Sequence, residues 1–298
     1  SIDKSSVSLN LNEKNFLGTG RSVGFSASLS GTKSDFDLSL AEPFFLNRNL
    51  SASTSIFSKK VEGGSATTST KGIGFGLGFR AANDVYHRLT YNFAENKTNQ
   101  NSNNSSSSTG ESSERLISSA VGYILGIEKR NNRFDPTEGF FAEISETYSG
   151  VGGDVNFLKS RLRGAYYKPV SFDRFVLGAR SEIGHINGLG ENVTQSNRFL
   201  LGGNKVRGFD GAGIGPRDNT SEGAVGGNNY YAGSFEVISD VGFNPDLGMR
   251  WTLFADYGSA WGTDFPTGVV GAEDDSMRQS LGFGLLWDTA IGPLSFYW

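Results

Sequence analysis

Apolar and polar side chains alternate with a period of two along most of the chain. In residues 71–80, Ile73, Phe75, Leu77 and Phe79 fall on one face, and glycines fall on the other. Strict alternation is typical of β-strands that bury one face, and no stretch keeps a helical period over several turns. The pattern therefore predicts an all-β protein.

We expect about 14 strands, most of them roughly 9–14 residues long. Strands of soluble sheets usually have about 5–6 residues, whereas a strand that crosses a membrane at a tilt needs about 9–11. The length therefore favours a transmembrane sheet. The expected strands are residues 5–13, 21–30, 34–42, 49–59, 71–80, 85–95, 115–129, 139–149, 154–169, 174–187, 224–238, 248–261, 276–288 and 293–298.

The connections between these strands alternate between compact and long. The compact ones are residues 14–20, 42–48, 81–84, 131–139, 171–173 and 289–292. The long ones are residues 61–70, 96–113, 188–223 and 262–275. Outer-membrane barrels have short periplasmic turns and longer external loops, and a soluble sandwich has no reason to keep that order. We therefore expect a transmembrane antiparallel β-barrel.

Composition removes several other classes of protein. The chain has 298 residues and no Cys, which excludes a disulfide scaffold and a Cys-ligated metal site. The longest weakly polar run, residues 116–127, is too short for a membrane-spanning helix of about 20 residues. A net charge of -4 gives no electrostatic reason to expect a nucleic-acid partner. Mean hydropathy does not separate a soluble all-β protein from a barrel, because a barrel averages an apolar outer face with a polar lumen.

The most distinctive stretch is residues 199–218, FLLGGNKVRGFDGAGIGPRD, which contains Val206, Arg207, Gly208 and Phe209 in sequence. These four residues resemble the Val-Arg-Gly-(Phe/Tyr) motif of the BamA family of outer-membrane barrel assembly proteins and its two-partner-secretion and organellar relatives. The resemblance extends over nearly the whole chain in the same order. It is carried further by residues 15–24, 133–140, 224–239, 253–261 and 281–296.

The resemblance implies a 16-stranded barrel, of which about 14 strands are present here. Residues 1–298 would then form one transmembrane β-barrel domain that is incomplete at both ends, with the first and last strands missing. The soluble POTRA domains that precede the barrel in the family would be absent as well.

The resemblance also implies that the long extracellular loop 188–223 folds back into the lumen, with Arg207 near its tip. In the family, the corresponding arginine meets two inward carboxylates on the next two strands, which map onto Glu236 and Asp256. Alternation supports the inward direction independently, because both carboxylates share the polar face of their strands. A guanidinium suits such a site because it stays charged and offers several donors. The plain alternative is an ordinary arginine in a Gly-rich loop.

The high glycine content of the chain agrees with a loop that returns into the lumen. The chain has 41 glycines, about 14% and roughly twice the usual share. We expect strand glycines such as those at 72–78 to leave room in the lumen for the returning loop. Gly208 would permit a backbone turn beside the arginine, and Phe209 would pack against the inner wall.

The function implied by the resemblance is the insertion and folding of other β-barrel proteins in the bacterial outer membrane through a lateral seam. The implied partners are the outer-membrane lipid bilayer, unfolded outer-membrane protein clients, and periplasmic chaperones and accessory lipoproteins that bind through the POTRA domains. Two alternatives stay open. One is a two-partner-secretion-type pore that translocates a polypeptide, and the other is a passive porin.

Other chemistry in the chain is weak. His87 and His185 are far apart in sequence, and no nucleophile–base–acid constellation is visible. The acidic residues Glu273, Asp274 and Asp275 are more typical of a solvated loop than of a cation site. We therefore expect a non-enzyme that needs neither a metal nor another cofactor.

Overall fold

Within the residues that the structure describes, fourteen antiparallel strands form one sheet, and each pairs with the strand of that sheet that follows it along the chain. The computed structural model describes residues 7–31, 33–62, 66–100, 114–133, 135–170, 175–220, 222–240, 248–265, 268, 270–271, 275–289 and 292–298. The strands of the sheet are β1 (Val7–Glu13), β2 (Ser22–Leu29), β3 (Lys33–Glu42), β4 (Leu50–Glu62), β5 (Ala66–Arg80), β6 (Val85–Gln100), β7 (Glu114–Glu128), β8 (Gly139–Ser149), β9 (Phe157–Val170), β10 (Phe175–Gly188), β12 (Asn229–Asp240), β13 (Met249–Trp261), β15 (Arg278–Thr289) and β16 (Gly292–Tyr297).

Smaller elements lie in the connections. β11 (Arg217–Asp218) pairs with β14 (Val270–Gly271), and short 3-10 helices form η1 (Phe16–Gly18), η2 (Phe45–Asn47) and η3 (Gln195–Asn197). Within the described part of the chain, no helix has the length and apolar character needed to cross a bilayer.

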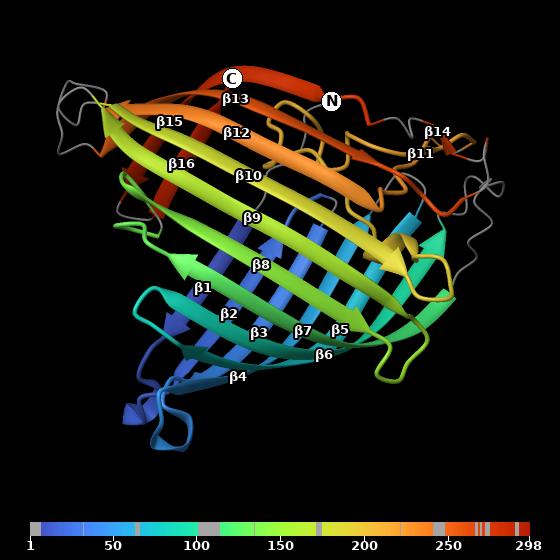
Figure 1. Ribbon diagram of the computed structural model, residues 1–298, viewed down its shortest axis with the longest axis horizontal. Helices are drawn as coiled ribbons and strands as arrows, with labels where there is room; N and C mark the ends of the chain where they lie inside the picture. The colour runs from blue at the N-terminus through green and yellow to red at the C-terminus, as the bar shows by residue number, and fades with distance from the viewer. Residues whose placement is uncertain are drawn as a thin grey trace.

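The sheet curls round on itself. Figure 1 shows the green-to-orange strands of the second half of the chain crossing in front of the blue strands of the first half. Because successive strands are antiparallel, their connections alternate between two rims. The turns that hold η1 and η2 lie at one rim, and β11 and β14 lie at the other (Figure 1). The predicted antiparallel β-barrel is confirmed.

The outer face of the wall is apolar. Phe75, Leu77 and Phe79 on β5 are 49%, 42% and 48% exposed, and the glycines between them face the opposite side. Soluble proteins rarely expose apolar surface on this scale, whereas the lipid-facing side of a membrane barrel requires it. The alternation in the sequence therefore separates a lipid face from a lumen face.

Aromatic side chains mark two levels on the outer face. Trp251 packs edge-on against Phe175 near the short-turn rim, and Trp261 packs against Tyr231 toward the other rim. The two tryptophans are ten residues apart on β13, which is about 33 Å along a strand and about 25 Å across a bilayer at a tilt of about 40°. An apolar band of that height, with aromatic girdles at both edges, is typical of outer-membrane barrels.

The prediction of a long loop at residues 61–70 was wrong. β4 continues to Glu62 and β5 starts at Ala66, so that paired strand covers most of this stretch. Thr67 and Thr68 are β-branched and therefore favour strand, although they are polar. A strand that projects beyond the lipid needs no apolar face, which explains why the alternation is missing here.

Two other boundaries also differ from the expected ones. β6 extends to Gln100, so the tract 96–113 begins as paired strand, and its residues 101–113 lie outside the described part of the chain. β12 starts at Asn229 rather than at residue 224, because residues 224–228 still belong to the preceding connection.

The turn between β7 and β8 connects distant parts of the wall. Asp135 in this turn forms an ion pair with Arg250 on β13, 115 residues away in the sequence. At the start of the turn, Nη2 of Arg130 lies 2.7 Å from Oε2 of Glu128. β13 is no neighbour of β7 or β8 in the sheet, so the turn bridges strands that do not pair.

The assignment of the two faces predicts unequal effects of the same substitution. Leu89→Arg places a cation on the lipid face of β6, where it should lower the free energy of unfolding by about 2–4 kcal/mol near the midplane. Asn92→Arg places the same cation on the lumen face, where water can solvate it, and should cost less than about 1 kcal/mol. Denaturant titration of the protein folded in lipid vesicles measures both values. Equal costs would contradict the assignment.

Candidate functional site

The long connection between β10 and β12, residues 189–228, has ordered structure of its own. Phe199 pairs with Gly227, and Leu201 pairs with Ile214, in isolated bridges. Gly202 has a φ of +132°, and a side chain there would lie 1.9 Å from a backbone oxygen of the same connection, so only glycine fits. The connection therefore has a defined conformation with which it can pack against the strands of the barrel.

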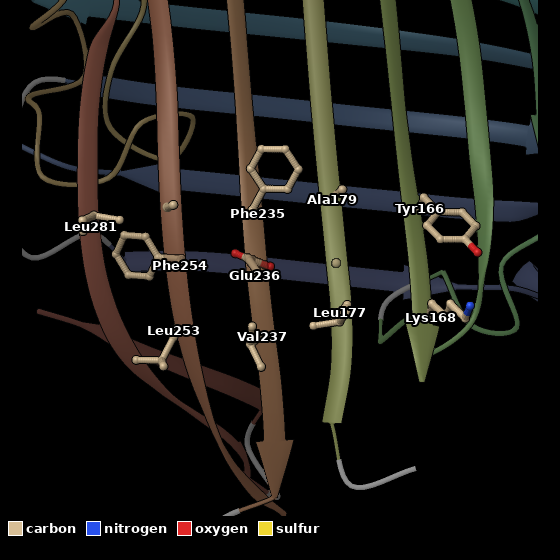
Figure 2. Close-up of a pocket in the computed structure, with 12 residues that line it drawn as sticks. Tyr166, Lys168, Leu177, Ala179, Phe235, Glu236, Val237, Leu253, Phe254 and Leu281 are labelled. Atoms are coloured by element: carbon tan, nitrogen blue, oxygen red, sulfur yellow. The ribbon is translucent and has the colours of Figure 1, made fainter. Parts of the chain in front are cut away.

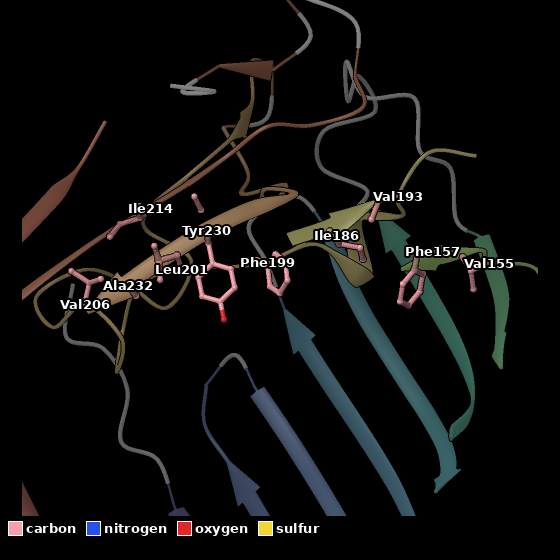
Figure 3. Close-up of a cluster of buried hydrophobic side chains, with 11 residues drawn as sticks. Val155, Phe157, Ile186, Val193, Phe199, Leu201, Val206, Ile214, Tyr230 and Ala232 are labelled. Carbon is pink, nitrogen blue, oxygen red and sulfur yellow. The ribbon is translucent and has the colours of Figure 1, made fainter. Parts of the chain in front are cut away.

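Apolar residues of this connection pack against the wall in one buried cluster. Leu201 and Val206 are fully buried, and the ring of Phe199 packs at a tilt against Tyr230 of β12, with ring centroids 4.4 Å apart. Figure 3 shows the cluster running from Val206 and Ile214 at one end to Phe157 and Val155 at the other. It consists of Val155, Phe157, Ile186, Val193, Phe199, Leu201, Val206, Ile214, Tyr230, Ala232 and Ala260.

Glycines of the wall make room for this cluster. A Cβ at Gly258 of β13 would lie 3.0 Å from Cγ2 of Val206 and 3.1 Å from Cδ2 of Leu201, and one at Gly184 of β10 would lie 2.9 Å from the ring of Phe199. The strand glycines at 72–78 have other nearest neighbours, mainly side chains of β4 and β6. The glycines that admit the connection are therefore not the ones that stand out in the sequence.

Arg207 makes its most extensive contacts with Asp256 on β13. Its Nε lies 2.7 Å from Oδ2 and its Nη2 lies 2.7 Å from Oδ1, which is the bidentate geometry of a strong charge-assisted pair. The backbone N–H of Arg207 donates to Oδ2 as well, at 2.9 Å. Asp256 thus holds both the side chain and the main chain of one residue.

Two further groups on β12 complete the polar contacts. Nη2 of Arg207 lies 2.7 Å from Oε1 of Glu236 and donates to Oγ of Ser234 at 2.9 Å. Arg180 on β10 also reaches Glu236, with 3.0 Å between its Nη2 and the same Oε1. Glu236 on β12 therefore contacts both Arg207 of the connection and Arg180 of β10.

Aromatic rings cover the guanidinium. Cζ of Arg207 lies 3.6 Å from the ring centroid of Phe254 and 4.9 Å from that of Tyr297 on β16. The two rings are edge-on to each other, with centroids 5.7 Å apart. A cation over a desolvated ring gains electrostatic attraction that water would otherwise screen.

Burial and charge act in opposite directions on Arg207, which is 9% exposed. Burial lowers the pKa of the guanidinium, but the hydrogen bonds and negative charges of Asp256 and Glu236 outweigh this effect. The net result is a pKa raised above the ordinary value of arginine. The group therefore remains a cation over the whole physiological range, and the contact does not switch with pH.

The other motif residues have different surroundings. Val206 is fully buried in the apolar cluster, and Phe209 is half-buried and packs against the same cluster. Gly208 is exposed and has a φ of +88°, a conformation that L side chains rarely adopt. The motif thus places an apolar anchor, a cation and a left-handed turn in consecutive positions.

Several contact residues escaped the sequence analysis. Arg180 and Ser234 lie on the polar faces of their strands, so parity gives their direction but not their partner. Phe254 is a large apolar residue at a position of β13 where the alternation predicts a polar one. Its ring is the one over which the guanidinium of Arg207 lies. Nothing in the local sequence indicates Tyr297, because its contact depends on how β16 pairs with β15.

A second charged contact lies nearer the rim at which β11 and β14 lie. Nζ of Lys205 lies 2.8 Å from Oε1 of Glu182 on β10 and 4.4 Å from the ring centroid of Tyr230. Tyr230 donates a hydrogen bond to the same carboxylate. The connection is therefore fixed to the wall by at least two independent polar contacts on either side of Val206.

The remaining candidate groups do not converge. Nδ1 of His87 lies 2.7 Å from the hydroxyl of Tyr123, and Nδ1 of His185 lies 2.7 Å from Oδ1 of Asn229. Glu273 and Asp274 lie outside the described residues. Among the described residues there is no group of three or more His, Cys, Asp or Glu side chains placed to hold a metal ion.

The Omp85 superfamily domain matches residues 15–298. The chain belongs to the Omp85 superfamily. The outer membrane protein assembly factor BamA of Neorickettsia risticii is 29% identical over 287 residues, which are 95% of this chain and 38% of that protein. The human sorting and assembly machinery component 50 homolog is 26% identical over 259 residues, which are 85% of this chain and 54% of that protein. The chain thus spans about half or less of these relatives.

Two solved structures confirm the barrel fold. BamA from Haemophilus ducreyi lacking POTRA domains 1–3 superposes with a TM-score of 0.82 at 23% identity and covers 99% of this chain and 64% of that chain. CdiB from Acinetobacter baumannii superposes with a TM-score of 0.61 at 13% identity and covers 99% and 52%. At these identities, both show the fold alone.

Removal of the buried cation should release the connection. Arg207→Ala leaves Asp256 buried without its cation and leaves Glu236 with Arg180 alone, so docking should weaken by about 3 kcal/mol, or on the order of a hundredfold in local opening. Hydrogen exchange within residues 198–216 measures this opening. Arg115→Ala is the matched control, because Arg115 is an exposed arginine whose ion pair with Glu95 should contribute less than about 1 kcal/mol. Equal protection in both variants would contradict the anchoring role.

A single methyl group on the wall tests the apolar side of the same contact. Gly258→Ala should lower the free energy of unfolding by about 1–3 kcal/mol, because the methyl meets the backbone oxygen of Tyr231 as well as Val206 and Leu201, and its contacts with the last two should raise protease cleavage within residues 198–216. Gly76→Ala adds the same methyl to the lumen face of β5, where it meets a serine hydroxyl that can rotate away. Similar cleavage in both variants would show that the packing does not hold the connection.

Proposed function

We propose that this barrel inserts and folds other β-barrel proteins in the bacterial outer membrane, through a lateral seam in its wall. The proposal rests on the similarity to the assembly factors BamA and to the sorting and assembly machinery component 50 homolog. The outer face, with its apolar band between two aromatic levels, suits the same membrane.

The proposed mechanism uses strand pairing rather than catalysis. In lipid, an unpaired backbone N–H or C=O has no water to bind, so an incoming strand gains free energy when an existing strand edge pairs with it. Burial of the apolar face of the client supplies the remaining driving force. We therefore propose a non-enzyme that needs no nucleotide, metal or other cofactor.

The contact of Arg207 with Asp256 is the observation that carries the proposed role of the loop. We propose that loop 188–223 is a plug in the lumen and that Arg207, Glu236 and Asp256 lock it there. The bidentate pair, the backbone hydrogen bond and the aromatic cover support a fixed position rather than a mobile one. A lumen filled in this way would stay closed while the wall accommodates a client.

The proposed partners follow from the same reading. They are the outer-membrane bilayer and unfolded outer-membrane protein clients. Periplasmic chaperones and accessory lipoproteins would bind through POTRA domains of the full-length protein. The polypeptide-translocating pore and the passive porin remain the alternatives. The similarity to BamA and to the sorting and assembly machinery component 50 homolog supports the assembly role, and a loop that fills the lumen would not suit a passive porin.

A cell that depends on the full-length protein tests this function. Arg207→Ala should lower the amounts of folded outer-membrane barrels, because an unlocked plug disturbs the wall, while Arg115→Ala should leave them unchanged. Immunoblots of heat-modifiable barrel proteins measure the result at matched levels of the variants. Normal growth and normal barrel levels with Arg207→Ala would overturn the proposed lock.

Conductance in planar bilayers separates a plugged barrel from a passive porin. With the loop intact the assembly barrel should pass little current, and deletion of residues 198–216 should produce a large steady current. A constant large current with the loop in place would favour the porin.

A further inference from the structure

The outer face of β9–β15 contains a shallow groove at a row of residues that pair across five strands. Large and small side chains alternate along this row, so that Ala179 and Ala255 form low points between larger neighbours. The row consists of Tyr166, Ala179, Phe235, Ala255 and Leu281. Small residues between large ones on a membrane-facing wall leave space that lipid must fill.

The space on this face is substantial. One hollow of about 510 Å³ lies against Ala255, Leu253 and Leu281, and a second of about 550 Å³ extends toward Ile183. Tyr166, Ala179 and Phe235 line both hollows, so the two adjoin. These volumes are within the range of about 300–1,000 Å³ that is typical of small-molecule sites.

The adjoining hollows extend over about one leaflet. Lys168 lines the first hollow and Leu162 lines the second, six residues apart on β9. Six residues are about 20 Å along a strand and about 15 Å across a bilayer at a tilt of about 40°, which is half of a hydrocarbon core of about 30 Å. One acyl chain that starts at the membrane surface would therefore follow the groove to the midplane.

Lys168 lies at the end of the groove nearest the short-turn rim. It is exposed and pairs with Leu177, beside Val237 and Leu253, and Figure 2 shows these residues abreast near the end of β9. The next row of outward-facing paired residues toward the short-turn rim contains Trp251, which marks the aromatic level at that rim. No carboxylate of the described residues forms an ion pair with Lys168. A cation at this depth can reach the headgroup level with its flexible stem.

We propose that this groove binds an anionic phospholipid of the periplasmic leaflet. One acyl chain lies over Ala179 and Ala255 between the larger side chains, and the phosphate pairs with Lys168. The charge decides the occupant, because a lysine that has no ion-pair partner among the described residues, at the interface of an apolar groove, matches a negative headgroup. Glu236 lies on the same wall but binds Arg207 on the lumen side, so it does not repel the phosphate.

Native mass spectrometry of the full-length protein with equal phosphatidylglycerol and phosphatidylethanolamine tests the headgroup contact. Lys168→Ala should lower the ratio of bound phosphatidylglycerol to bound phosphatidylethanolamine about fivefold, the factor that corresponds to about 1 kcal/mol per basic residue at an anionic surface. Lys168→Arg should keep the ratio. Lys14→Ala is the control, because it removes an exposed lysine at the same rim.

A second variant tests the acyl contact. Ala255→Phe fills the groove and should remove the tightly bound lipid whatever its headgroup, while Ala27→Phe, on the outer face of β2, should not. Far-UV circular dichroism and heat-modifiable migration establish that each variant is folded. An unchanged ratio in Lys168→Ala, or an equal loss of both lipids, would overturn the headgroup contact. Retention of bound lipid by folded Ala255→Phe would overturn the groove, and if that variant does not fold, the ratio in Lys168→Ala alone decides.

Discussion

Backbone hydrogen bonding in lipid is the constraint on which this structure depends. A strand inside the bilayer has no water to satisfy its N–H and C=O groups, so neighbouring strands must satisfy them, as they do on both sides of every strand of the sheet from β2 to β15. Pairing places alternate side chains on opposite faces, and the lipid then selects large apolar residues for one of them. The other face is free to be polar, which is what allows a charged contact to exist at the centre of a membrane protein.

The contact of Arg207 uses that freedom. Asp256 and Glu236 stand on neighbouring strands, and a guanidinium can satisfy both because its donors point in several directions. A lysine at the same place would offer a point charge and could not hold Asp256 at two oxygens. The apolar cluster around Val206 and the cationic contact are adjacent in sequence, so the connection is fixed by burial and by charge at one place.

The sequence predicted most of the fold and part of the site, for physical reasons that differ. Period two reveals a strand only where one face meets lipid, which is why the polar ends of β4 and β5 were mistaken for a loop. The direction of Glu236 and Asp256 follows from parity, and their meeting with Arg207 was expected from the family resemblance. The roles of Arg180 and Tyr297 depend on which strands lie side by side and on how far each is shifted, and local sequence contains no information on either. The role of the wall glycines under the long connection could not be predicted for the same reason, because Gly258 matters only through its close approach to Val206.

The ion pair between Asp135 and Arg250 has a mechanical consequence. A barrel whose strands are joined only to their neighbours can flatten or shear, because every hydrogen bond can tilt a little without breaking. A bridge from the β7–β8 turn to β13 acts as a diagonal brace, and together with the contacts of the long connection on β10, β12 and β13 it stiffens that side of the wall. Deformation of the cross-section on that side of the wall should therefore cost more free energy than strand pairing alone would require.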